Sequence, residues 1–122
     1  MDPEEISRLP ERVLDGKVAE AFFSSRVVWT DGDEPVRVDK DLETGMDMRV
    51  EVSPYSVSID HAWRIVDLAR AKGWTVSIHL RPEDVEVVMT SGEDAEMGRA
   101  TAAYTPRALA EAALQAGLRG MR

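Results

Sequence analysis

Two histidines are the first residues to consider, because imidazole can bind a metal ion or transfer a proton near neutral pH. His61 falls in a segment with helical periodicity, and His79 falls on the polar side of an alternating strand pattern. Two histidines with no third ligand at a metal-binding spacing do not meet the requirements of a zinc site. The sequence therefore predicts no metal site and no cofactor.

Alternating acids form the second group that could do chemistry. Asp39, Asp41 and Glu43 are spaced like the first ligands of a calcium loop. An EF-hand loop needs glycine at position six and glutamate at position twelve. Counted from Asp39, those positions hold Thr44 and Val50. We expect a solvated hairpin turn here, with an adventitious cation site as the alternative.

Motifs for covalent or phosphate chemistry are missing. The chain has no cysteine, and no serine is flanked by glycines as in a nucleophile elbow. The adjacent carboxylates Glu83 and Asp84 fall in a predicted turn rather than facing each other in a buried cleft. The glycine of Asp31-Gly32-Asp33 is surrounded by acids, which would repel phosphate. We expect a protein without enzymatic activity.

The charge of the chain is concentrated in its first half. The net charge is −8, and residues 1–60 hold 15 acidic and 7 basic side chains. Residues 31–51 alone hold 8 acidic and 3 basic side chains. Nucleic acid is a poor partner for such a surface, whereas a protein with a basic surface would be attracted to it. The alternative is that these acids serve solubility alone.

The segment between residues 31 and 52 is thus the predicted interaction surface. It reads as an acidic hairpin that extends beyond the main sheet, and Trp29, next to the acidic turn, is expected to be the tryptophan most free to face a partner. Trp63 and Trp74 are expected in the core instead. The residues expected to contact a partner are Trp29, Asp31, Asp33, Glu34, Asp39, Asp41, Glu43 and Asp47.

Nothing in the chain points to a membrane or to export. No segment approaches the roughly 20 apolar residues that span a bilayer. The first residues, MDPEEISRLPER, are acidic and polar, unlike a signal peptide. Together with the lack of cysteine, these features favour a cytoplasmic protein.

The clearest local structure runs from Tyr55 to Leu80. Apolar residues at helical spacing predict a helix over residues 57–72, and Gly73 suits the residue that ends it. Strict alternation then predicts a strand over 74–80, followed by a turn and a strand over 85–90.

The remaining elements follow from caps and periodicity. Asp2 and Pro3 begin a short helix, and Thr105 and Pro106 begin a final one that Gly117 is expected to end. A solvated loop is expected over 91–98. The other predicted elements are a helix over 11–23 and strands over 26–30, 36–40, 46–52 and 99–104.

These segments together resemble the phage ABA sandwich domain. The resemblance implies a layered α/β/α sandwich, a bacteriophage or prophage origin and no known activity, so it carries over no catalytic residue. The acidic hairpin fits the family pattern least well. The residues that carry the resemblance are Tyr55, Ser56, Ile59, Ala62, Trp63, Ile65, Val66, Gly73, Trp74, Thr105, Pro106, Ala108, Leu109, Ala112, Ala113 and Leu114, preceded by Leu14–Glu20.

We therefore expect residues 1–122 to form one α+β domain, with a mainly antiparallel sheet and helices on both faces. The leading hypothesis is a small phage accessory protein that binds a basic surface of a host or phage protein. The alternative is a pocket protein that binds or sequesters a small molecule. Exposed strand edges could also pair two copies into a homodimer.

Overall fold

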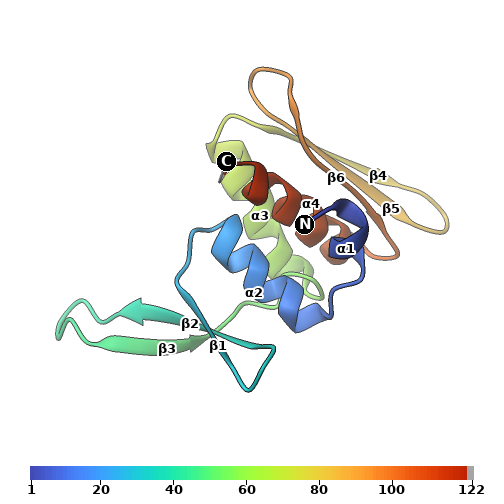
Figure 1. Cartoon of the computed structure of the whole chain (residues 1–122). Coiled ribbons are helices and arrows are strands. Elements are labelled where there is room, and N and C mark those ends of the chain that lie inside the picture. Colours follow the sequence, from blue (N-terminus) through green and yellow to red (C-terminus); the bar gives the residue numbers. More distant parts are fainter. Residues whose placement is uncertain (121–122) are drawn as a thin grey trace.

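The computed structural model describes residues 1–120 and shows an α+β fold, as predicted (Figure 1). All strand pairs are antiparallel. The helices are α1 (Pro3–Ser7), α2 (Glu11–Ala21), α3 (Ile59–Ala71) and α4 (Thr105–Gly120). The strands are β1 (Val27–Thr30), β2 (Glu34–Lys40), β3 (Asp47–Glu51), β4 (Thr75–Leu80), β5 (Val85–Thr90) and β6 (Glu96–Ala102).

The strands form two sheets rather than the single sheet expected from the sequence. One has the order β1-β2-β3 and the other the order β4-β5-β6. They are separated because the helices lie between them: α2 packs against β2, while α4 packs against β5 and β6 (Figure 1). The β2–β3 hairpin extends away from this body at the lower left of Figure 1.

Helix α4 is the centre of the core, and glycines allow it to pack closely on both sides. Its Leu109 and Leu114 are buried, as are all five of its alanines. A side chain at Gly98 would overlap the carbonyl oxygen of Ala112 in α4. A side chain at Gly117 would lie 2.6 Å from the backbone of Ala21 in α2. Gly117 therefore serves close packing, and the prediction that it ends the helix is wrong.

Gly98 also explains why the last strand begins earlier than expected. The sequence predicts a solvated loop through this residue, but β6 begins at Glu96 and Gly98 pairs with Met89. Gly98 is buried under α4. Glycine is usually read as a loop signal, whereas here it makes room for a helix backbone.

Helix α3 follows its predicted periodicity, with one exception. Ala62, Ile65 and Ala69 are fully buried, and Gly73 follows the helix with φ of +80°. Trp63, however, is 47% exposed, so the prediction that it lies in the core is wrong. Trp63 lies at the edge of the apolar stripe, where burial depends on whether a neighbouring element covers it.

Charged side chains of α2 and α4 bond to the backbone of segments that precede other helices. The carboxylate of Asp15 is fully buried, accepts a hydrogen bond from the backbone N–H of Ser56 at 2.8 Å and pairs with Arg12 at 3.0 Å. Arg107 pairs with the buried Glu111 at 2.7 Å and also donates to the carbonyl oxygen of Leu9 at 2.8 Å. Both ion pairs are local, and the hydrogen bonds of Asp15 to Ser56 and of Arg107 to Leu9 connect them to parts of the chain that are far apart in sequence.

Within the described part of the chain, no helix combines the length and the apolar character that crossing a bilayer requires.

Candidate interaction surface

The eight residues predicted to contact a partner fall into two groups at opposite ends of β2. Trp29, Asp31, Asp33 and Glu34 surround the β1–β2 turn. Asp39, Asp41, Glu43 and Asp47 surround the β2–β3 turn. The strand between them has 7 residues and, at roughly 3.3 Å per residue, separates the two turns by about 20 Å. The eight residues therefore belong to two acidic turns rather than to one continuous acidic surface, and Figure 1 shows these turns at opposite ends of β2.

At the first turn, Trp29 packs against helix α2. Its ring approaches Gly16 so closely that a Cβ there would lie 2.6 Å from the indole. The indole Nε1–H donates to Glu20 at 3.3 Å, and the ammonium of Lys17 lies 5.6 Å from the ring centroid. Trp29 is thus less free to meet a partner than the sequence suggested. Among the acids of this turn, Glu34 forms a long ion pair with Arg12, with 4.0 Å between Oε1 of the glutamate and Nε of the arginine.

The second turn is ordered by its own polar groups. The Asp41 carboxylate accepts hydrogen bonds from the backbone N–H groups of Glu43 at 2.8 Å and Thr44 at 3.3 Å. The backbone of Asp41 bonds to Met46 and Gly45, both at 2.8 Å. Gly45 has φ of +71°, which glycine adopts without strain. The end of the hairpin therefore has a defined shape.

Two of the four acids at this end have cationic partners. Asp39 pairs with Arg37 at 3.1 Å, and Asp47 pairs with Arg26 at 3.5 Å. Within the described residues, Asp41 and Glu43 form no ion pair. Their two negative charges are therefore the ones most available to a partner.

Exposed apolar side chains lie among these acids, and sequence reasoning missed their importance. Leu42 is fully exposed, Met46 is 69% exposed and Met48 is also exposed. The alternation of Met46 and Met48 with charged residues predicts a hairpin with one wet face, which would bury both methionines, but both are exposed. The signal available in the sequence was Leu42 itself, an apolar residue in the middle of an acidic turn. We call Leu42, Met46, Asp41 and Glu43 the hairpin tip.

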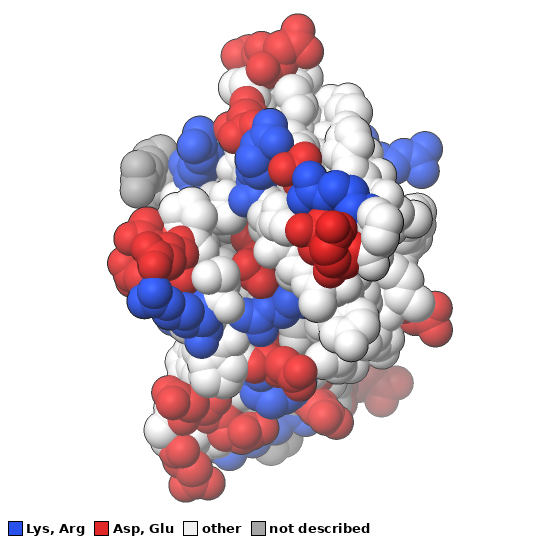
Figure 2. Space-filling view, turned by 90° about the vertical axis from the view of Figure 1, so that its right-hand side faces the viewer, with Lys and Arg blue, Asp and Glu red and all other residues white. Residues whose placement is uncertain are grey.

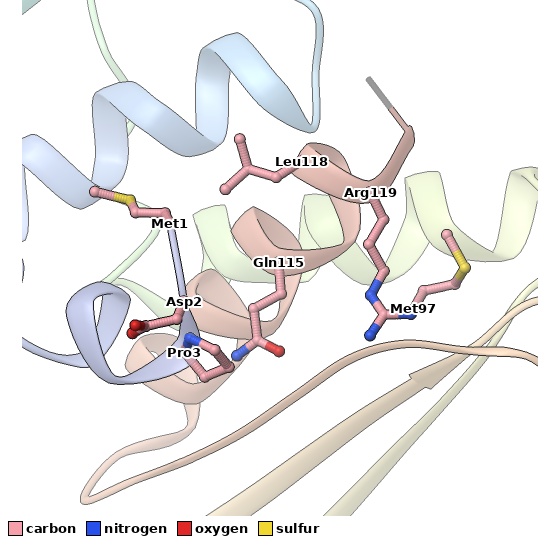
Figure 3. A pocket seen from close by; sticks show the side chains of 7 residues that line it. All are labelled: Met1, Asp2, Pro3, Met97, Gln115, Leu118 and Arg119. Carbon is pink, nitrogen blue, oxygen red and sulfur yellow. The ribbon is translucent and has the colours of Figure 1, made fainter. Parts of the chain in front are cut away.

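A cavity of about 630 Å³ lies between the chain start and the end of α4 (Figure 3). Its polar side chains already have structural partners. Asp2 accepts from the backbone N–H of Glu5 at 2.8 Å, Gln115 bonds to the backbone of Arg99, and Arg119 donates to the carbonyl of Glu96 at 3.0 Å. The remaining lining residues are Met1, Pro3, Met97 and Leu118. The cavity therefore has few polar groups left to orient a ligand.

Among residues 1–120, no three potential metal ligands gather into a site. His61 is half-buried on α3, whereas His79 is exposed on β4.

On the face shown in Figure 2, acidic and basic side chains are intermixed rather than separated by sign, with uncharged areas between them.

Comparison with known proteins supports the fold. A phage protein from Bacillus cereus ATCC 14579, known from a crystal structure, superposes with a TM-score of 0.57 at 20% sequence identity. The match covers 88% of this chain and 92% of that protein. No protein-family model matches the chain, and no curated protein matches it either. The chain therefore shares its fold with a phage protein, while the specific family that the sequence resembles has no further support.

Proposed function

We propose that this chain is a non-enzymatic phage or prophage accessory protein that acts inside the host cell by binding another protein through the hairpin tip. The observation that carries the proposal is the full exposure of Leu42 beside the carboxylates of Asp41 and Glu43, which form no ion pair among residues 1–120. Covering the exposed apolar side chains of the hairpin tip with a partner surface removes them from water, which favours binding. The fold shared with a phage protein supports the proposed origin.

The chemistry of the tip defines the partner. Asp41 and Glu43 favour a surface that carries lysine or arginine, and Leu42 and Met46 require an apolar depression between those cations. Charge attraction would mainly speed the encounter, whereas burial of the apolar side chains would slow dissociation. We therefore propose a basic protein surface with an apolar centre, of host or phage origin.

Paired substitutions at the two acidic turns test this proposal. Asp41→Asn with Glu43→Gln removes two charges from the tip, and asparagine can still accept the hydrogen bonds that order the turn. Asp31→Asn with Asp33→Asn removes two charges from the other turn and is the matched control. Asparagine also tolerates the positive φ of 44° at residue 31.

The measurement is quantitative affinity capture from host cells at several salt concentrations, followed by titration of the captured protein. We expect the tip variant to bind at least about tenfold more weakly, a change of roughly 1.4 kcal/mol, with less salt dependence. A Leu42→Ser variant should weaken binding without changing the salt dependence. Equal losses at the two turns, or unchanged binding of the tip variants, would contradict the proposal.

A further inference from the structure

The two edges of the β4–β6 sheet differ in how they are protected. At the β6 edge, Gln115 of α4 accepts a hydrogen bond from the N–H of Arg99 at 3.1 Å and donates to its carbonyl oxygen at 2.7 Å. Arg119 donates to the carbonyl of Glu96 at 3.0 Å. Side chains of α4 thus occupy backbone groups that a further strand would otherwise use.

The β4 edge has no such protection. Within residues 1–120, the backbone of β4 makes no hydrogen bond except to β5. The strand, TVSIHL, contains no proline or lysine, and its register with β5 is unbroken. By contrast, the exposed edge strand β3 alternates apolar residues with Asp47, Arg49 and Glu51, charges that discourage pairing. The β4 edge is therefore open to another strand.

Exposed apolar side chains accompany this open edge. Helix α3 packs against β4 and α4. Its Arg64 donates to Ser53 at 3.4 Å on one flank. At about 100° per residue, Trp63 lies about 100° and Ile59 about 140° around the helix axis from Arg64, and they are 47% and 48% exposed. Leu80 at the end of β4 is 74% exposed.

From these features we propose that β4 pairs antiparallel with β4 of a second copy of this chain, forming a symmetric dimer with a continuous six-stranded sheet. Residues that face each other in antiparallel strands lie on the same face of the sheet. A two-fold axis at Ile78 would place Val76 opposite Leu80 and Ser77 opposite His79. Apolar side chains then meet apolar ones, and polar side chains meet polar ones, so the strand complements itself.

The exposed side chains of α3 favour a second copy over a single extended peptide. A stable interface buries roughly 600–1,000 Å² on each partner, which the edge of a six-residue strand does not supply alone. A two-fold axis perpendicular to the sheet keeps the helices of both copies on the same face. The second α3 then lies beside the first, where it can cover Ile59 and Trp63. A peptide would cover the strand edge and leave these side chains in water.

Matched lysine substitutions at the two edges test the dimer. His79 and Thr101 both pair with Glu86, so they belong to one cross-strand row at opposite edges, and both are exposed. His79→Lys introduces a charge at the proposed interface, whereas Thr101→Lys introduces the same charge at the protected edge. Trp63→Glu tests the contribution of α3 separately.

Sedimentation of the whole chain provides the measurement. At about 100 µM, a dimer with a micromolar Kd is mostly formed. We expect the wild type and Thr101→Lys to sediment as dimers, and His79→Lys and Trp63→Glu to dissociate at least about tenfold more readily. A monomeric wild type would overturn the proposal, even if β4 then proved to bind a peptide. A dimer that survives both substitutions, or that Thr101→Lys disrupts equally, would also overturn it.

Discussion

At the scale of single residues, the buried Asp15 shows how this small fold uses charge for structure rather than for chemistry. Its two carboxylate oxygens are engaged separately, one by the backbone of Ser56 and the other by Arg12. These contacts attach the segment before α3 to helix α2. Both oxygens of this acid are engaged by structural donors, and the side chain is fully buried, so its contacts are with the fold itself.

We predict that Asp15→Ala lowers the free energy of unfolding by about 3 kcal/mol, because it leaves a buried N–H and an arginine without their partner. Asp15→Asn keeps an acceptor for Ser56 and should lose about 1 kcal/mol. Urea denaturation measures both. Asp67→Ala, an exposed position on α3, is the control and should change stability by less than about 0.5 kcal/mol. Similar losses at both positions would show that Asp15 is not a structural anchor.

Tyr55 gives a prediction about alkaline pH. Burial raises the pKa of its phenol above the ordinary value of about 10, and the Ser53 hydrogen bond and the nearby Arg37 and Arg64 offset this only in part. The raised pKa means that the unfolded chain releases the phenol proton first. The stabilisation is therefore complete below pH 10 and is lost as the pH rises through the folded-state pKa.

We expect the stability of the wild type to fall above about pH 10, and Tyr55→Phe to show a smaller fall. In Tyr104→Phe, Tyr55 is the single remaining tyrosine. Ultraviolet titration of that variant should detect tyrosinate above pH 10 in the folded protein. Ionisation at or below the pH seen in the urea-unfolded chain would contradict the role of burial.

At the scale of elements, close packing between α4 and its neighbours depends on residues without side chains. Gly98 in β6 and Gly117 in α4 both lie against the backbone of another element. A backbone cannot rotate away from an added methyl group as a flexible side chain can. Helix α4 therefore has little freedom to move relative to the sheet or to α2.

We predict that Gly98→Ala lowers the free energy of unfolding by about 3 kcal/mol, because α4 must shift to admit the methyl group. Gly120→Ala is the control, since an added Cβ meets no atom within 4 Å there. That substitution should be neutral or slightly stabilising, as alanine favours a helix. Thermal unfolding of the two variants measures the difference in stability. Equal unfolding midpoints would mean that α4 can shift away from residue 98 at no cost.

The elements themselves were largely predictable from the sequence. The strand β5 was predicted at its observed bounds, and α3 was predicted within two residues at its start. Asp2 caps α1 as expected, with a hydrogen bond of 2.8 Å to Glu5. These features depend on neighbours a few residues apart, where periodicity and capping act. Gly98 and Gly117 were misread because their role depends on distant segments.

At the scale of the whole molecule, sequence patterns were less informative. An amphipathic strand shows that one face is buried, but not which sheet contains it, so the division into two sheets could not be predicted. The position of Trp63 depends on the same arrangement, since no element within residues 1–120 covers this side chain, which is 47% exposed. The two acidic turns were treated as one surface because they are close in sequence, yet β2 separates them.

The hairpin tip also has a consequence for evolution. Its exposed residues contribute little to the core, whereas the helices and the β4–β6 sheet are tightly constrained by packing. Substitutions at the tip can therefore accumulate at small cost to folding. A lineage that faces changing partners could alter this projection rapidly while keeping the same scaffold. We expect homologues to diverge most at the tip and least where α4 meets the sheet.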